Sequence, residues 1–153
     1  MDNILRIYLD TSVIGGCFDK EFASASNVLF SEFDKNKFIP LISETVAAEL
    51  ENAPEKVKRK LKRLSNLEII MISEEMKSLA GKYLKSSIVT LRYADDALHI
   101  AAATIAKADV LVSWNFKHIV NLRKIQAFNA VNLKNNYAAL EIRTPKEVID
   151  DEK

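Results

Sequence analysis

The chain has 153 residues, of which 48% are hydrophobic and 28% charged, a composition typical of one globular domain that needs no structural disulfide or metal. Its net charge of +1 excludes a global electrostatic field that attracts nucleic acid, so a basic binding surface would have to be local. The single cysteine, Cys17, excludes an internal disulfide, and no secretory leader or membrane-spanning apolar stretch is recognisable, so we expect a soluble cytoplasmic protein.

Short apolar runs alternate along the chain with segments of helical periodicity. In chain order the pattern predicts a strand at 4–9, a helix centred on 28–33, a strand at 38–42, helices beginning at Ser43 and after Pro54, a strand at 67–72, a helix from Ser73, a helix at 93–108, a strand at 109–113, a helix at 121–134 and a strand at 140–144. This alternation is typical of βαβ units, which build a mostly parallel sheet. No linker divides the chain, so we expect one α/β domain over residues 1–153.

Four polar residues lie where the predicted elements place them near one edge of that sheet. Asp10 ends the first strand, Asn115 follows the fourth, Glu49 lies on the helix after the second, and Asp96 begins the helix that leads to the fourth. In parallel sheets, ligands bind beyond the carboxyl ends of the strands, where the strand order reverses. We therefore expect these four side chains to converge.

Each acidic candidate also has a purely structural explanation. Asp10, Thr11 and Ser12, within "RIYLDTSVIGG", could cap a helix or form a turn, or could offer oxygen ligands to a hard cation. Asp96, with its neighbour Asp95, could stabilise the positive end of a helix dipole, and Glu49 could be an ordinary solvated helix residue. The local sequence leaves these alternatives open.

The segment "LVSWNFKHIVN" brings aromatic and polar residues together after the fourth strand. Trp114 and Phe116 are interpreted as core residues in preference to base-stacking platforms, and Lys117 is a candidate phosphate contact. His99, on a buried helix without a recognisable metal-binding pattern, is interpreted as a hydrogen-bonded core residue.

A basic run lies in "EKVKRKLKRL", where an inner stripe of Val57, Leu61 and Leu64 leaves the charges outside. These charges form either a solvated helix face or a local ridge for phosphate backbones. Its candidate RNA-binding residues are Lys56, Lys58, Arg59, Lys60, Lys62 and Arg63.

The order of Asp10, Glu49, "DALHIAAA" and "LVSWN" resembles the PIN-domain family, and in particular its small VapC-like toxins, over about residues 4–145. The resemblance implies a sheet of order 3-2-1-4-5 and RNA cleavage that depends on Mg²⁺ or Mn²⁺. Asp10, Glu49 and Asp96 match the metal-holding acids of the family, and Asp95 is an additional neighbour. Supporting roles fall to Thr11, Ser12 and Ser113.

One position departs from the family pattern, because Asn115 stands where many members have Asp. Its neutral side chain lowers the negative charge of the predicted site by one, which should weaken metal binding. The leading hypothesis is a metal-dependent endoribonuclease that uses Asp10, Glu49, Asp96 and Asn115 and is the toxin of a toxin–antitoxin pair. The resemblance also implies an antitoxin partner and a homodimer. The alternative, motivated by Asn115, is a catalytically weak RNA-binding or protein-interaction module.

Overall fold

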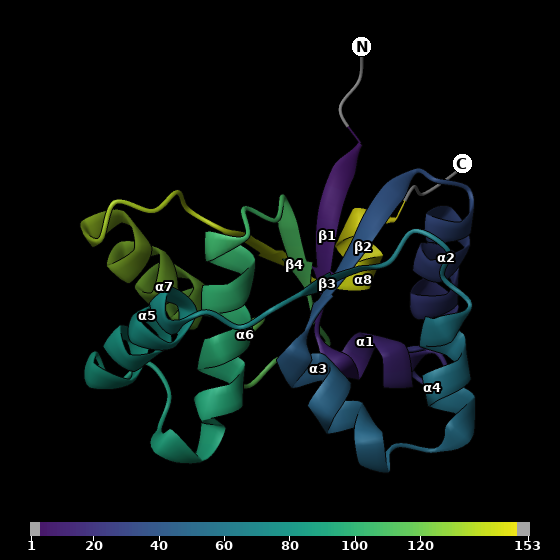
Figure 1. The fold of residues 1–153 in the computed structure, drawn as a ribbon, viewed down its shortest axis with the longest axis horizontal. Coiled ribbons are helices and arrows are strands. Elements are labelled where there is room, and N and C mark those ends of the chain that lie inside the picture. The colour runs from purple at the N-terminus through teal and green to yellow at the C-terminus, as the bar shows by residue number, and fades with distance from the viewer. Residues whose placement is uncertain (1–3, 150–153) are drawn as a thin grey trace.

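A computed structural model describes residues 4–149 as three layers, with a central sheet between two groups of helices (Figure 1). The five strands are all parallel and lie in the order β3-β2-β1-β4-β5, which confirms the predicted fold. They are β1 (Leu5–Leu9), β2 (Phe38–Ser43), β3 (Glu68–Ile70), β4 (Val110–Val112) and β5 (Glu141–Arg143). The sheet order reverses around β1, so the candidate edge lies where β1 and β4 end side by side.

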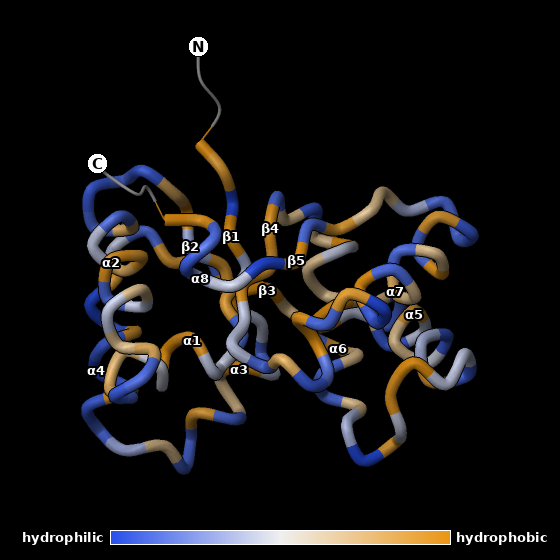
Figure 2. Tube along the Cα trace, turned by 180° about the vertical axis from the view of Figure 1, so that it is seen from behind, coloured by the Kyte–Doolittle hydropathy of each residue, from blue (hydrophilic) through white to orange (hydrophobic). Residues whose placement is uncertain are grey.

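The helices cover both faces of the sheet. They are α1 (Thr11–Gly16), α2 (Ala23–Asp34), α3 (Glu44–Glu49), α4 (Glu55–Lys62), α5 (Glu74–Lys85), α6 (Ala94–Ile105), α7 (Leu122–Lys134) and α8 (Pro145–Val148), with 3₁₀ turns η1 (Leu50–Asn52) and η2 (Leu91–Tyr93). Helices α5, α6 and α7 lie on one side, and α2, α4 and α8 on the other, in both views (Figures 1 and 2). Every predicted helix is present, and the structure adds α1 and α8.

Three predicted strands are shorter by two residues or more than the segments that suggested them, and the strand expected at 140–144 contains only β5. The strand expected at 67–72 contains only β3, which pairs with Leu41–Ser43 at the edge of the sheet. The strand expected at 109–113 contains only β4. Past β3 the apolar run reaches the surface, since Met71 is 69% exposed, so an apolar pattern alone overestimates the length of this edge strand.

The core forms where β1 and α6 meet. Ile7, Tyr8 and Leu9 are fully buried, as are the small residues 101–103 of α6. Alanine side chains allow a helix backbone to lie close to a sheet, so α6 holds its first turn firmly against the sheet edge. Figure 2 shows hydrophobic segments gathered in the central strands and hydrophilic ones mostly in outer loops and α4.

Local capping fixes where the helices begin. The Ser43 side chain accepts a hydrogen bond from the Thr45 N–H, and the Ser73 side chain accepts one from the Met76 N–H. These contacts confirm both predicted helix starts. On α4, Val57 and Leu61 are buried, which confirms the predicted inner stripe. Within residues 4–149, no helix is long and apolar enough to span a membrane.

Candidate active site

An open cavity of about 450 Å³ lies at the carboxyl edge of the sheet, at the ends of β1 and β4. The structure brings four separated candidates together in its wall, namely Asp10, Glu49, Asp96 and Asn115. Thr11 and Ser12 line the same cavity, whereas Ser113 is buried behind it. The convergence follows from the parallel sheet and from α6, whose N-terminus reaches this edge.

Asp10 is held by two hydroxyl groups. Its side chain is only 8% exposed, and Oδ2 accepts hydrogen bonds from the Oγ atoms of Ser12 (2.7 Å) and Ser113 (2.8 Å). Each of these hydroxyls accepts a backbone N–H in turn, from Trp114 and Asn115 respectively, so each directs its single proton at Asp10. Asp10 occupies the N-cap position of α1, but its side chain makes no capping bond there.

Glu49 projects from the last turn of α3 toward the same space. Its Oε1 accepts hydrogen bonds from Thr11 Oγ1 at 2.6 Å and from His99 Nε2 at 2.9 Å. Burial raises the pKa of Glu49, but the hydrogen bond and positive charge of His99, with the Thr11 hydroxyl, outweigh this and place the pKa below its ordinary value. The carboxylate is therefore ionised and oriented.

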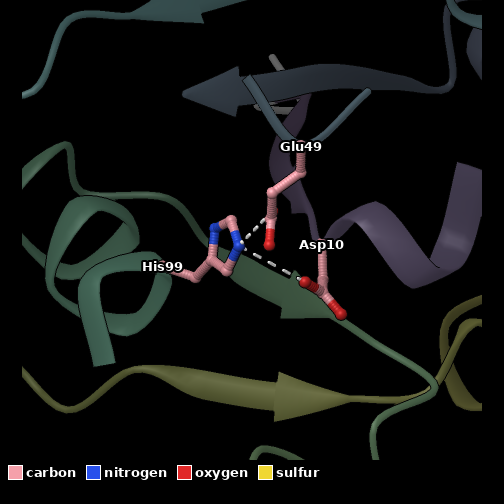
Figure 3. A group of neighbouring side chains, drawn as sticks. All are labelled: Asp10, Glu49 and His99. Carbon is pink, nitrogen blue, oxygen red and sulfur yellow. Dashed lines mark hydrogen bonds and ion pairs between the residues drawn. The ribbon is translucent and has the colours of Figure 1, made fainter. Parts of the chain in front are cut away.

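His99 lies between two of the acids, as Figure 3 shows. Its fully buried imidazole is hydrogen-bonded through Nδ1 to the Tyr8 hydroxyl at 2.7 Å, and its Nε2 lies 3.6 Å from Asp10 Oδ1. Burial lowers the pKa of His99, but the Glu49 hydrogen bond and the neighbouring carboxylates raise it above its usual value. The interpretation as a buried, hydrogen-bonded residue is confirmed.

Sequence reasoning missed how close His99 lies to the acids. Ligand atoms of Asp10, Glu49 and His99 all lie within 4.8 Å of one another, as in a metal-binding group. The available signal was the spacing of Asp96 and His99, because residues three apart lie on the same face of a helix. His99 Nε2 already interacts with Glu49, so the imidazole holds that carboxylate in place.

Of the three candidate acids that line the cavity, Asp96 has the weakest hydrogen bonding to its carboxylate. Burial and then the charges of Asp10 and Glu49 raise its pKa to about 6, although His99 and the Asn115 amide lower it. Asn115 Nδ2 lies 3.4 Å from Asp96 Oδ2, and Asn115 Oδ1 accepts a hydrogen bond from the His118 N–H at 3.0 Å. The amide of Asn115 thus joins Asp96 to the turn after β4.

The donor chemistry of the cavity fits a divalent cation. The three candidate carboxylates line the cavity, and in addition to burial the charges of Asp10 and Glu49 raise the pKa of Asp96. Hard cations such as Mg²⁺ and Mn²⁺ prefer such oxygen ligands. A bound cation of this kind would offset the repulsion.

The comparisons with known proteins agree with this geometry. The family model described as "PIN domain" matches residues 6–117, which contain every candidate site residue. The chain belongs to the PIN-domain family. No match to this PIN domain was found among curated proteins.

Solved structures share the fold. The structure of VapBC2 from Rickettsia felis bound to a DNA fragment from their promoter is 26% identical, with a TM-score of 0.54 over 74% of this chain and 90% of that one. VapC20 of Mycobacterium tuberculosis, a Sarcin-Ricin loop cleaving toxin, is 11% identical, with a TM-score of 0.56 over 73% of this chain and 92% of that one. This PIN domain is therefore VapC-like in structure.

Asp95 does not join the other acids of the PIN domain. Its side chain is exposed and lines a neighbouring cavity together with Glu44 and Glu49. Successive helix residues point about 100° apart, so Asp96 and Asp95 face different cavities.

The aromatic residues after β4 correct one sequence interpretation. Trp114 is partly buried, but Phe116 is 53% exposed and so is not a core residue. The turn that Asn115 stabilises keeps Phe116 at the surface.

The basic residues of α4 lie on the outer face of that helix. Lys58 lies 3.7 Å from Glu55, whereas a small group, defined here as the basic pocket, surrounds the exposed ring of Phe18. The cations of the basic pocket are Lys56, Arg59, Lys60 and Arg63. Lys62 and Lys117 are also exposed, with Lys117 next to the candidate site in the turn after Asn115.

Proposed function

We propose that this PIN domain is a metal-dependent endoribonuclease that hydrolyses phosphodiester bonds of RNA. One observation carries the proposal: Asp10, Glu49 and Asp96, from three separate segments, line one cavity at the edge of a PIN-family sheet. That arrangement concentrates negative charge where a divalent cation and a phosphate can meet.

Asp10, Glu49 and Asp96 would hold Mg²⁺ or Mn²⁺, with Asp10 as the central ligand. When bound, such an ion polarises phosphoryl oxygens and lowers the pKa of a bound water. The chain contributes orientation: Ser12 and Ser113 fix Asp10. No side chain has to act as a covalent nucleophile.

Positioning residues hold Glu49 and Asp96. Thr11 and His99 donate to Glu49, and the Tyr8 hydroxyl fixes the far side of the His99 ring. A ligand whose orientation is set before the metal arrives loses less freedom on binding. Asn115 plays a weaker part, since its amide lies 3.4 Å from Asp96.

RNA would follow the basic residues beside the cavity. Phe18 of the basic pocket and Asp19 of the acidic cavity are adjacent in the chain, so the two sites lie on either side of one turn. Phosphates leaving the cavity on this side would meet the α4 cations, and those in the turn after β4 would meet Lys117. The candidate contacts are Lys56, Lys58, Arg59, Lys60, Lys62, Arg63 and Lys117.

We further propose that the nuclease is the toxin of a toxin–antitoxin pair and forms a homodimer. The likeness to VapBC2 of Rickettsia felis supports an antitoxin partner. Co-expression with the product of the neighbouring small gene, followed by light scattering, tests both the complex and the dimer.

The deciding experiment is cleavage of a mixed structured RNA pool in EDTA, Mg²⁺ or Mn²⁺. Wild-type protein should cut only with metal, and Asp10→Asn should lose at least about 100-fold in rate, because the substitution removes the central ligand charge. Asp34→Asn, which changes an exposed carboxylate at the end of α2, is the matched control and should cut normally.

Unfolding curves for both variants establish that any loss is chemical. Undiminished cutting by folded Asp10→Asn would refute the proposed site. No cutting with either metal would favour the catalytically weak RNA-binding or protein-interaction module.

A further inference from the structure

Three aromatic side chains form a cluster beside the acidic cavity. Phe22 and Trp114 are stacked, with ring centroids 4.4 Å apart and planes at 18°. Phe116 lies 6.3 Å from Phe22 and 6.2 Å from Trp114, and it is 53% exposed. The cluster therefore has a partly buried inner pair, Phe22 and Trp114, and an exposed outer ring, Phe116.

Within the inner pair, Trp114 is held in a fixed position relative to the candidate metal ligands. Trp114 Nε1 donates to Ser26 Oγ at 2.8 Å, and the Trp114 backbone N–H donates to Ser12 Oγ at 2.9 Å. Ser12 in turn donates to Asp10. The position of the indole is therefore coupled to that of the central carboxylate by two successive hydrogen bonds.

Phe22 and Trp114 separate two cavities. They line the acidic cavity on one side, and on the other they line a cavity of about 570 Å³ that also includes Phe116, Glu21 and Lys146. We name the second one the aromatic cavity. Its volume lies in the usual range for small-ligand sites.

The segment 113–116 contributes alternately to the two sites. Ser113 bonds to Asp10 and Asn115 contacts Asp96, whereas Trp114 and Phe116 belong to the aromatic cluster. Because Phe22 and Trp114 line both cavities, a strand bound with one phosphate at the acids can continue into the aromatic cavity. We therefore expect the aromatic cavity to be filled by another part of the same RNA strand.

We propose that the aromatic cavity binds an unpaired nucleobase of the RNA whose phosphate occupies the acidic cavity. The inference rests on the proposed function. Every base presents a π-face that stacks on an exposed aromatic ring, here Phe116. Lys146 offers a cation to the adjoining phosphate, and the Glu21 carboxylate offers an acceptor to a base amino group.

This site would select single-stranded or looped RNA over duplex. In a duplex each base is stacked between its neighbours and is unavailable to an aromatic side chain. Binding in the aromatic cavity would therefore favour cleavage in unpaired segments. It would not require recognition of one particular base.

Binding in EDTA tests the inference while cleavage is switched off. The only tryptophan of the chain, Trp114, lines the cavity, so quenching of its fluorescence by a short unpaired oligoribonucleotide reports occupancy. Phe116→Leu keeps an apolar side chain without a π-face and should weaken binding about tenfold, whereas Phe116→Tyr should bind as wild type. Leu133→Ala, at an exposed apolar position on α7, is the control and should have no effect.

A second ligand separates base stacking from backbone attraction. An oligomer of the same length with abasic ribose throughout should bind Phe116→Leu and wild type equally, because only phosphate contacts remain. Equal affinity of Phe116→Leu and wild type for the normal oligomer would overturn the inference. If RNA binding stays unchanged while Phe116→Leu abolishes self-association, the surface is an interface between copies of the chain.

The outcome is independent of the cleavage test. Phe116-dependent binding without metal-dependent cleavage would refute the proposed nuclease activity but support the nucleobase site in the aromatic cavity. Metal-dependent cleavage with RNA binding that does not depend on Phe116 would refute only the nucleobase site.

Discussion

At the scale of single residues, the three acids differ in how well the protein supports their charge. Asp10 accepts two hydroxyl protons, and Glu49 accepts one hydroxyl proton and an imidazole N–H. Among residues 4–149, Asp96 has only a long hydrogen-bond contact, with Asn115. Asp96 is therefore the acid whose ionisation costs the metal-free fold the most.

That difference predicts a substitution that stabilises the metal-free protein. The pKa of Asp96 is raised from 3.8 to about 6, so the neutral acid favours folding, and this contribution is lost as pH rises through 6. Asp96→Asn should make the protein in EDTA about 1 kcal/mol more stable at pH 7.5, after allowance for solvent screening. The gain should vanish below about pH 3, where Asp96 is largely protonated in both the folded and the unfolded protein.

Urea unfolding of wild type and Asp96→Asn at the two pH values measures this difference. The same variant should bind Mn²⁺ at least about tenfold more weakly, since it lacks a ligand charge. Equal or lower stability of Asp96→Asn at pH 7.5 would show that Asp96 is not under electrostatic stress.

A substitution at Asn115 should have the opposite effects on metal affinity and on the stability of the metal-free protein. Asn115→Asp adds a carboxylate next to Asp96 and should tighten Mn²⁺ binding by about tenfold at neutral pH, while lowering the stability of the metal-free protein. Titration calorimetry measures the affinity. Asn52→Asp, an exposed position in η1, adds the same charge elsewhere and should leave the affinity unchanged. Unchanged affinity in Asn115→Asp would place that side chain outside the metal ligands.

At the scale of elements, α1 and the segment after β4 pack together at one glycine. A methyl group on Gly16 would lie 2.8 Å from Ser26 Oγ and 2.9 Å from the Trp114 ring, whereas one on Gly15 would meet nothing within 4 Å. Neither glycine has a positive φ. Gly16 therefore serves the close approach of Trp114, and not an unusual backbone conformation.

The two neighbouring glycines form a matched pair for a stability test. Gly16→Ala should destabilise the fold by about 1–3 kcal/mol, because the indole must move to make room. Gly15→Ala should be neutral or stabilising by up to about 1 kcal/mol, since alanine favours a helix. Thermal unfolding with tryptophan fluorescence follows both stability and the Trp114 environment. Similar behaviour of the two variants would contradict the close packing at Gly16.

At the scale of the whole molecule, a net charge of +1 conceals a separation of charge. Acids gather in one cavity, and cations gather on the outer face of α4. Such a surface attracts RNA locally, in proportion to the phosphates it neutralises.

The salt dependence of RNA binding tests this separation. Replacing three cations of the basic pocket with glutamine should reduce the slope of log affinity against log salt by about 2, because each lost phosphate contact contributes roughly 0.7 on single strands. The variant carries Lys56→Gln, Arg59→Gln and Arg63→Gln. A control with three exposed lysines of α5 and α7 replaced, on the other side of the sheet, should keep the wild-type slope; its changes are Lys77→Gln, Lys85→Gln and Lys134→Gln. An equal effect of both triple variants would rule out a specific role for α4.

The sequence by itself determined the elements of this protein and their order. Apolar runs located the strands, Ser43 and Ser73 located two helix starts, and alternation of the two patterns indicated a parallel sheet. From that sheet alone, Asp10 and Asn115 were expected at one edge, because parallel strands end on the same side. These features depend on neighbours within a few residues, which is why local patterns sufficed to predict them.

Tertiary packing decided which side chains touch. It placed His99 between Asp10 and Glu49, turned Asp95 away from Asp96, and left Phe116 at the surface. The contact of His99 with Glu49 spans 50 positions of sequence, and that of Ser113 with Asp10 spans 103. Helical periodicity gives the face on which a residue lies, but only the packing of α3 and α6 against β1 and β4 sets the distances between side chains from different elements.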